Sequence, residues 1–242
     1  MKRSGLDAFG FIAKRSKKIT GPCVPPVRSA SLGLGKLLVS ETNVTEEGGF
    51  EVFCDLDGVL VDFDSGVRKI FNGRGPDDIS SQGQMWAAIS RQPSFYADLP
   101  WTKDGRDLWN AIKHLRPNIL TGVPRTKKSR QEKVAWCTRE LGVQTNHVDM
   151  AGKKSSHERV EGRIVEGVVN VITCWSKNKH HESRDGAVLI DDRESLGGEW
   201  RKKGGIFIHH TSSTTTIEKL IQLGIIKQEK DQNTPDVIEI LE

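Results

Sequence analysis

Short apolar runs, bounded by glycine or polar residues, recur through the middle of the chain. Runs in which adjacent positions are apolar are typical of strands that are buried on both faces of a sheet. The first run is interrupted only by two aspartates and Gly58, so it predicts a strand followed by an acidic turn. In all, the pattern predicts strands within Phe50–Leu60, Asn118–Gly122, Val168–Cys174, Ala187–Asp192 and Gly205–His210.

Apolar residues at helical spacing lie between these runs. Residues 64–100 carry two short amphipathic patterns around the breaker NGRGPDD, which predict the helices of a small inserted unit. Further helices are predicted over 101–117 with an Asp104 N-cap and a Pro117 stop, over 128–142 ended by Gly142, and over 214–224 with threonine caps. Apolar strands that alternate with helices predict an α/β fold with a doubly wound, Rossmann-like parallel sheet, covered by helices on both faces.

The sequence divides into a central domain and two tails. Residues 1–45 mix glycine, proline, serine and basic residues without periodicity, and a disordered basic tail is predicted there. Residues 46–228 form the predicted domain, with the inserted unit, or cap, at about 64–100. A polar, charge-rich surface insertion is predicted at about 147–167, and a C-terminal tail at 229–242.

The positive charge of the chain lies in the N-terminal tail. The first 40 residues hold eight basic residues and Asp7 as their one acid, a net charge of +7, which leaves −3 for the rest of a chain whose total is +4. The cluster KRSKK, Lys14–Lys18, is typical of nuclear-import or nucleic-acid-binding patches, and Ser4–Phe11 imperfectly resembles peptides that dock on sliding clamps. Residues 1–40 therefore predict contact with a nucleic acid or a nuclear protein.

Hydrophobic residues make up 36% of the 242 residues, and none of the apolar runs approaches the roughly 20 residues that a membrane span needs. The first residues lack the apolar core of a secretory signal. The four cysteines form neither a C-x-x-C pair nor a zinc-like cluster with histidine. These features predict an intracellular protein, cytoplasmic or nuclear, with no membrane partner.

Chemically active residues follow the predicted strands, at the point where each strand ends. In a parallel sheet these ends share one edge, and ligands bind beyond it. Carboxylates suit a hard cation such as Mg²⁺, while lysine and hydroxyl groups neutralise phosphate oxygens, so the set points to phosphoryl chemistry. Its members are Asp55, Asp57, Thr121, Gly122, Ser176, Lys177, Lys179, Asp191 and Asp192.

The segments that carry these residues resemble the four motifs of the haloacid dehalogenase (HAD) superfamily of phosphatases, in the same order. They are DLDGVLV from Asp55, ILTG from Ile119, SKNKH from Ser176 and VLIDD from Val188. The run PW…DG..LW..I and the closing LIDD are similar to the 5′(3′)-deoxyribonucleotidase branch. The resemblance covers roughly residues 50–222 and omits the tail.

The resemblance implies a role for each residue. Asp55 would attack phosphorus to form an aspartyl-phosphate, and Asp57 would be the general acid and then the general base. Thr121 and Gly122 would bind phosphoryl oxygens. Magnesium would be held by Asp55, Asp57, Asp191 and Asp192. Lys179 is the preferred phosphate-binding lysine, with Lys177 as the alternative, and Lys153 or Lys154 could mimic it.

Three functions follow as hypotheses from this reading. The first is a Mg²⁺-dependent phosphatase of a nucleotide-like phosphate, and the second is a phosphatase of DNA or RNA ends. The third is a non-catalytic binding protein on the same fold, recruited through its tail. Aromatic residues in or beside the cap could stack on a nucleobase or pack its core: Phe63, Trp86, Phe95, Tyr96, Trp101 and Trp109.

Overall fold

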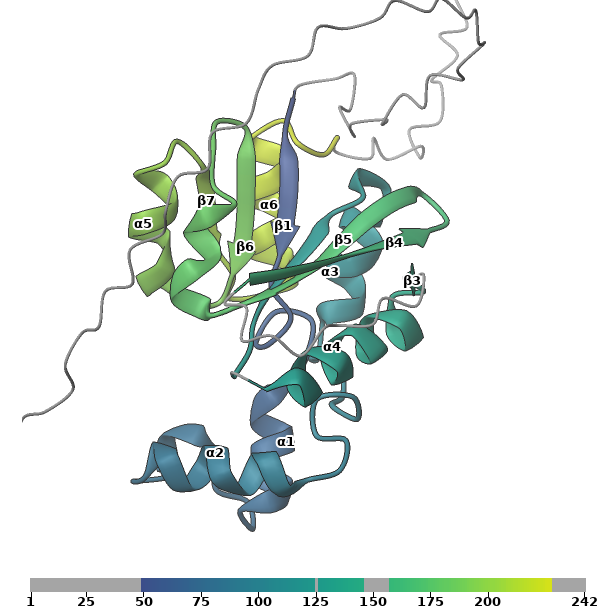
Figure 1. The fold of residues 1–242 in the computed structure, drawn as a ribbon. Helices are drawn as coiled ribbons and strands as arrows, with labels where there is room; N and C mark the ends of the chain where they lie inside the picture. The colour runs from purple at the N-terminus through teal and green to yellow at the C-terminus, as the bar shows by residue number, and fades with distance from the viewer. Residues whose placement is uncertain (1–48, 125, 146–156, 228–242) are drawn as a thin grey trace, which may run out of the picture. The chain divides into compact units, whose positions relative to one another are not determined.

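The structure is a computed structural model that describes residues 49–124, 126–145 and 157–227 (Figure 1). The predicted tails, 1–45 and 229–242, lie outside the described residues, and so do Lys153, Lys154 and the predicted partner-binding residues 1–40. Within the described ranges, none of the helices combines the length and the apolarity that crossing a membrane requires.

A seven-stranded mixed sheet forms the centre of the described domain. The five strands from β5 (Gly167–Cys174) to β7 (Ile206–His209) in the sheet order run parallel to one another. At the other edge, β3 (Gln144–Thr145) and β4 (His157–Ile164) each run antiparallel to the neighbouring strand. The α/β class is therefore confirmed, and the prediction of a wholly parallel sheet is wrong at one edge. The sheet order is β3 (Gln144–Thr145), β4 (His157–Ile164), β5 (Gly167–Cys174), β2 (Asn118–Gly122), β1 (Glu51–Cys54), β6 (Ala187–Asp191), β7 (Ile206–His209).

Strand β4 corrects the prediction of a surface insertion at 147–167. Residues 157–164 pair with β5 along their whole length, while 147–156 lie outside the described residues. Along β4, Val160 and Ile164 are buried and the charged residues between them are exposed. A strand with one face in water alternates apolar and charged positions. The charged residues on the exposed face of β4 are therefore the reason why the sequence predicted a surface loop there.

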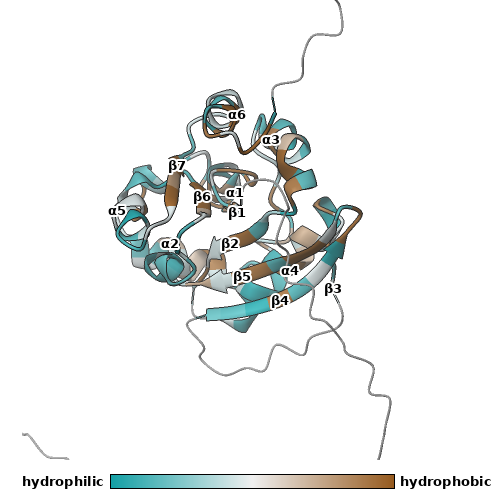
Figure 2. Ribbon diagram, turned by 90° about the horizontal axis from the view of Figure 1, so that it is seen from above, coloured by the Kyte–Doolittle hydropathy of each residue, from teal (hydrophilic) through white to brown (hydrophobic). Residues whose placement is uncertain are grey.

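The two faces of the sheet carry separate cores because adjacent strand residues point to opposite faces. The larger core packs alternate strand residues, such as Cys54 and Ile119, against α3 (Gly105–Ile112), α4 (Lys127–Glu140) and α6 (Ser213–Gln222). Figure 2 shows α3 and α6 on the same side of the sheet. The smaller core packs Phe53 and Leu120 against Trp200 of α5 (Gly197–Arg201). Both faces are therefore covered, as predicted.

Several predicted ends shift by a few residues. Strand β1 ends at Cys54, and the rest of the first apolar run forms a turn. Helix α6 is capped by the Ser212 side chain rather than by threonine. Asp104 occupies the N-cap position of α3, but its carboxylate accepts a hydrogen bond from the backbone N–H of Ser213 instead of capping the helix (2.6 Å).

The inserted residues fold into helices beyond the carboxyl ends of the parallel strands (Figure 1). They are α1 (Phe63–Ile70), the 3-10 turn η1 (Pro76–Asp78) and α2 (Gln82–Arg91). The unit closes on itself, since the N–H of Asp62 donates to Pro100 O and the N–H of Thr102 donates to Leu60 O, each at 2.9 Å. This stem holds the cap above the end of β1.

The sheet order places β1 between β2 and β6. The chain leaves β1 toward one half of the sheet and later returns to β6 on the other side, so the crossover direction reverses there. In open α/β sheets ligands bind at such a reversal, outside the carboxyl ends of the strands. The end of β1, where Asp55 lies, is thus the expected site.

Candidate active site

A tight turn after β1 positions the two aspartates of the first motif. Asp55 follows the last residue of the strand, and the turn is closed by the N–H of Gly58, which donates to Val61 O at 2.9 Å. Gly58 has a φ of +76°, and a Cβ there would lie 2.2 Å from Asp192 Oδ2. Glycine is needed at this position because the backbone is left-handed and because the loop after β6 approaches so closely.

Lys179 links the first and fourth motifs. Its Nζ lies 2.7 Å from Asp55 Oδ2 and 2.6 Å from Asp191 Oδ2, and all three side chains are buried. Burial alone would lower the pKa of Lys179, but the charges of Asp55 and Asp191 outweigh burial and raise it above its ordinary value. The lysine is therefore a fixed cation between two carboxylates.

Lys177, the alternative lysine, lies elsewhere. Its side chain is exposed, it is absent from the lining of the cavity described below, and its Nζ lies 5.4 Å from the centre of the Trp175 ring. Both lysines belong to the 3-10 segment η3 (Ser176–His181) that follows β5. The turn of η3 thus directs Lys179 inward and leaves Lys177 at the surface.

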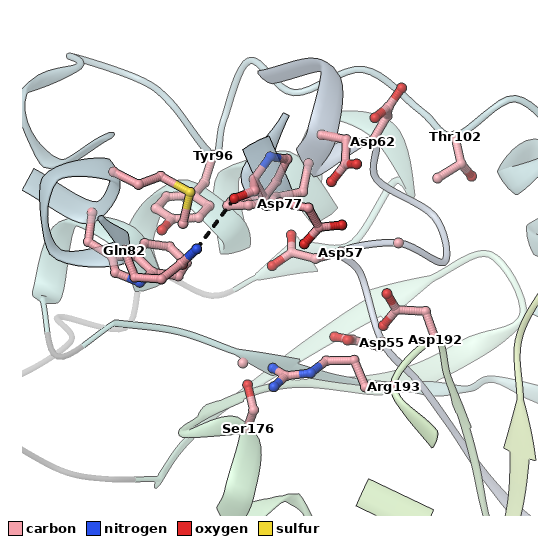
Figure 3. A pocket seen from close by; sticks show the side chains of 17 residues that line it. Asp55, Asp57, Asp62, Asp77, Gln82, Tyr96, Thr102, Ser176, Asp192 and Arg193 are labelled. Atoms are coloured by element: carbon pink, nitrogen blue, oxygen red, sulfur yellow. Dashed lines mark hydrogen bonds between the residues drawn. The ribbon is translucent and has the colours of Figure 1, made fainter. Parts of the chain in front are cut away.

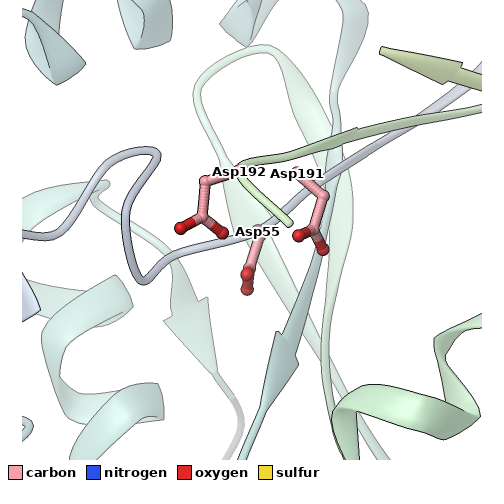
Figure 4. A group of neighbouring side chains, drawn as sticks. All are labelled: Asp55, Asp191 and Asp192. Carbon is pink, nitrogen blue, oxygen red and sulfur yellow. The ribbon is translucent and has the colours of Figure 1, made fainter. Parts of the chain in front are cut away.

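Three aspartates form a group that could hold a metal ion. Asp55, Asp191 and Asp192 each offer a carboxylate oxygen, and these oxygens all lie within 4.8 Å of one another (Figure 4). Burial raises the pKa of Asp192 to about 7, with a further contribution from the charges of Asp55 and Asp191. Asp192 Oδ1 is buried and has no hydrogen-bond partner. Crowded carboxylates with a buried oxygen that lacks a donor fit a hard cation with oxygen ligands.

A divalent cation bound by the three-aspartate group is expected to raise the unfolding temperature by several degrees, and by more at about pH 8 than at about pH 5. The folded pKa of Asp192, about 7, exceeds its ordinary value of 3.8. The folded state therefore binds more protons between these values, and the metal-free protein loses stability as the pH rises through this window. A cation that binds the ionised carboxylates offsets this loss.

Thermal unfolding with Mg²⁺ and with a chelator, at both pH values, measures the effect. In Asp192→Asn the gain from Mg²⁺ should shrink, and its pH dependence should weaken because the amide does not titrate. Asp191, whose pKa is also raised by burial, keeps the remaining pH dependence. An equal gain at the two pH values in the unaltered protein would contradict the prediction.

A second buried lysine, which the sequence analysis did not identify, holds Asp57. Lys133 of α4 donates to Asp57 Oδ2 at 2.6 Å and to Thr121 Oγ1 at 2.7 Å, and its side chain is 2% exposed. Burial raises the pKa of Asp57, Lys133 opposes this, and the charge of Asp55 adds to it. The helical spacing in the sequence could have indicated this lysine. Lys133 lies three and four residues before the apolar Trp136 and Cys137, and all three are buried on the same face of α4.

For a site that hydrolyses phosphate esters, replacing Lys133 with methionine is expected to lower kcat by about 100-fold, since Asp57 would lose the group that orients it. The unfolding temperature should fall as well, because a buried carboxylate loses its partner. Steady-state kinetics and thermal unfolding measure the two effects. The control is Lys127→Met, which removes an exposed lysine from the same helix. A kcat for Lys133→Met within twofold of the unaltered protein would refute a role in the site.

Thr121 and Gly122 end β2 beside these groups. Thr121 is fully buried, and its hydroxyl accepts the Lys133 hydrogen bond. A Cβ at Gly122 would lie 2.2 Å from Ser176 Oγ. Only glycine allows the start of η3 to come so near the end of β2, and this approach brings Ser176 to the same cavity that Gly122 lines.

A cavity of about 580 Å³, here called the acidic cavity, lies between the strand ends and the cap (Figure 3). Asp55, Asp192 and Ser176 lie on the side of the sheet, while Asp77 and Gln82 lie across from them on the cap. Arg193 is the one cationic residue among its lining, against six carboxylates: Asp55, Asp57, Asp62, Asp64, Asp77 and Asp192. An anionic substrate would be repelled by this lining unless a cation offset it.

The aromatic residues singled out in the sequence separate into two groups. Phe63, Trp86 and Tyr96 line the acidic cavity. Phe95 packs edge-on between Phe63 and Tyr96, Trp101 packs against Trp136, and Trp109 is buried. Only the first group, among the described residues, is placed to meet a ligand in this cavity.

The structure therefore brings together most of the residues predicted from the strand ends. Asp55, Lys179 and Asp191 are in direct contact, Asp192 joins the three-aspartate group, and Asp57 lies outside that group, bonded to Lys133. No protein-family model matches the chain, and no curated protein matches it. The chemistry of the site is therefore inferred from its side chains.

Proposed function

We propose that the protein is a Mg²⁺-dependent phosphomonoesterase of the haloacid dehalogenase type, which hydrolyses a nucleotide-like phosphate through an aspartyl-phosphate. One observation carries the proposal. Asp55 belongs to the three-aspartate group, accepts a hydrogen bond from the buried Lys179 and lines the acidic cavity. A mostly parallel sheet with a helical insertion after its first strand also supports this assignment.

In the first step, an Asp55 oxygen would attack phosphorus, and the bond from phosphorus to the ester oxygen would break. Asp55 is held for this by two donors, the N–H of Leu56 at 2.7 Å from Oδ1 and Lys179 at 2.7 Å from Oδ2. Asp57 would give its proton to the departing oxygen. The raised pKa of Asp57, caused first by burial, favours the protonated form that a general acid needs.

In the second step, the Asp57 carboxylate would take a proton from water, whose oxygen would attack phosphorus. The bond from phosphorus to Asp55 would then break, which restores the free carboxylate and releases phosphate. Lys133 would keep Asp57 aimed at the cavity in both steps, because the two side chains are bonded and Lys133 has almost no exposed surface. Gly122, which lines the acidic cavity, would bind a phosphoryl oxygen through its backbone N–H. Thr121 is fully buried outside that lining, so its hydroxyl would position Lys133 instead.

Asp55, Asp191 and Asp192 would hold Mg²⁺, which supplies Lewis-acid neutralisation of the charge on the phosphoryl oxygens. Asp191 is well fixed for this role, because it also accepts a hydrogen bond from the N–H of Arg193 at 2.9 Å and is fully buried. Asp57 lies outside the three-aspartate group and binds Lys133 through Oδ2, so its Oδ1, which is buried without a hydrogen-bond partner, is left for proton transfer.

A phosphate-ester panel tests the function. Hydrolysis of 5′- and 3′-nucleotides and of a simple aryl phosphate should require Mg²⁺ and disappear with a chelator. If none of the esters is cleaved with Mg²⁺ present, and Mg²⁺ does not stabilise the protein, the proposal fails and a non-catalytic binding protein becomes the better account.

A phosphatase of DNA or RNA ends is a second candidate, favoured by the +7 charge of residues 1–40. Its test adds 3′-phosphorylated oligonucleotides to the panel, with and without residues 1–45. For this candidate, deleting the tail should weaken oligonucleotide hydrolysis strongly at low salt. For a free-nucleotide enzyme, the same deletion should leave activity unchanged.

A further inference from the structure

A second cavity of about 450 Å³, here called the apolar cavity, lies between α2 and the start of α4. Trp86, Ala87 and Ile89 line it from α2, and Pro124 lines it from the loop before α4. Its volume is in the range of ligand pockets. None of the groups proposed for phosphoryl transfer lines it, so the proposed reaction leaves it unexplained.

The apolar cavity adjoins the acidic cavity. Trp86 and Tyr96 line both. Gly122, the last residue of β2, lines the acidic cavity, and Pro124, two residues further along the chain, lines the apolar one. The two cavities therefore share two aromatic residues, along which a ligand anchored at Asp55 would run into the apolar cavity.

The polar side chains around the apolar cavity are already engaged within the protein. The Ser90 hydroxyl donates to Ala87 O, and the hydroxyls of Thr126 and Ser129 share a hydrogen bond. Lys128 donates to Gln92 O, and Glu132 accepts from the N–H of Tyr96 at 3.0 Å. A ligand there therefore meets mainly apolar surface.

Tyr96 is the exception. Its side chain is 5% exposed, and its hydroxyl is buried with no hydrogen-bond partner. The Tyr96 ring packs edge-on against Phe95, with 5.0 Å between the two ring centres. The Nζ of Lys133 also lies over the Tyr96 ring, 5.3 Å from the ring centre. A buried hydroxyl without a partner costs free energy. Because Tyr96 lines both cavities, a ligand that bonds this hydroxyl would remove that cost.

We propose that the apolar cavity is a subsite for a flat, largely apolar ring in the leaving group of the phosphate ester. The ring would pack against Trp86 and Tyr96, and a polar atom on it would bond the Tyr96 hydroxyl. This inference rests on the proposed function for the position of the phosphoryl group, and it adds the class of leaving group. Aromatic walls favour a planar ring over a sugar or a charged chain.

The test fills the apolar cavity without touching the acidic one. Ala87→Trp adds bulk at a residue that lines only the apolar cavity, and Ser90→Phe does the same from the next turn of α2. Gln84→Trp is the control, since this exposed residue of the same helix lines neither cavity. The probes are 2-naphthyl phosphate, methyl phosphate and 2-naphthol, whose binding is followed by its own fluorescence. Thermal unfolding shows that each variant is folded.

Filling the cavity should lower both kcat/KM for 2-naphthyl phosphate and the affinity for 2-naphthol by tenfold or more. In the same variants kcat/KM for methyl phosphate should stay within twofold of the unaltered protein, and Gln84→Trp should stay within twofold for all three probes. If Ala87→Trp and Ser90→Phe both fold and leave 2-naphthol binding unchanged, the subsite is refuted. Binding of 2-naphthol needs no turnover, so its loss in these variants would support the subsite even if no ester were hydrolysed.

The hydroxyl has a separate arm. Tyr96→Phe should lower kcat/KM for 6-quinolinyl phosphate by about threefold to tenfold, the range of one hydrogen bond. The loss for 2-naphthyl phosphate, whose distal ring has no polar atom, should be at least threefold smaller, because for that ester the substitution changes only packing. Equal effects on the two esters would overturn the hydrogen bond to Tyr96.

Discussion

Asp55→Asn is expected to lower the kcat for phosphate-ester hydrolysis by about 10³-fold or more. The amide has nearly the shape of the carboxylate, but it lacks the charge that makes Asp55 a nucleophile. The N–H of Leu56 would keep an oxygen acceptor, so the turn after β1 should stay folded. The measurement is steady-state hydrolysis of an aryl phosphate with Mg²⁺, together with thermal unfolding.

Asp64→Asn is the matched control, because Asp64 lines the acidic cavity but is exposed and lies outside the three-aspartate group. It should keep kcat within about threefold. Mass spectrometry of enzyme quenched in acid during turnover should find phosphate on the peptide that contains Asp55. If Asp55→Asn retained a tenth of the activity, the aspartyl-phosphate mechanism would be wrong.

Lys179→Met should have the second largest effect, with a loss of about 100-fold or more in kcat/KM. The substitution removes the cation that lies within 2.7 Å of both Asp55 and Asp191. These two carboxylates are then buried close together without a positive partner. Breaking a buried pair in this way costs about 3–5 kcal/mol of stability. The unfolding temperature should therefore fall clearly, and Mg²⁺ should restore part of it.

Lys177→Met is the control, since it removes an exposed lysine from the same segment. Activity and unfolding temperature should stay near those of the unaltered protein. The reverse ranking, with Lys177→Met the more damaging, would show that the lysine of the motif is Lys177 and that the contact between Lys179 and Asp55 is not the functional one.

The order of apolar runs and helical patterns was sufficient to predict the α/β class and most elements. Asn118–Gly122 matches β2, and the other predicted parallel strands match to within a few residues, apart from the first, which ends early. Such strands are predictable because their own sequence is a run of apolar residues, which are buried in the sheet. The two-residue β3 and the half-charged β4 form by pairing with a neighbour, so their own pattern is weak.

The sequence by itself determined which residues stand at the strand ends. Because parallel strands share one carboxyl edge, the positions of Asp55, Thr121 and Asp191 followed from strand order alone. Tertiary structure alone decided which lysines meet them. The contact between Lys133 and Asp57 spans 76 residues and depends on how α4 is rotated against the sheet, while the turn of η3 selects Lys179 over Lys177. The apolar cavity likewise exists only where the cap meets α4. Local periodicity places a side chain on a face, and only packing decides what that face touches.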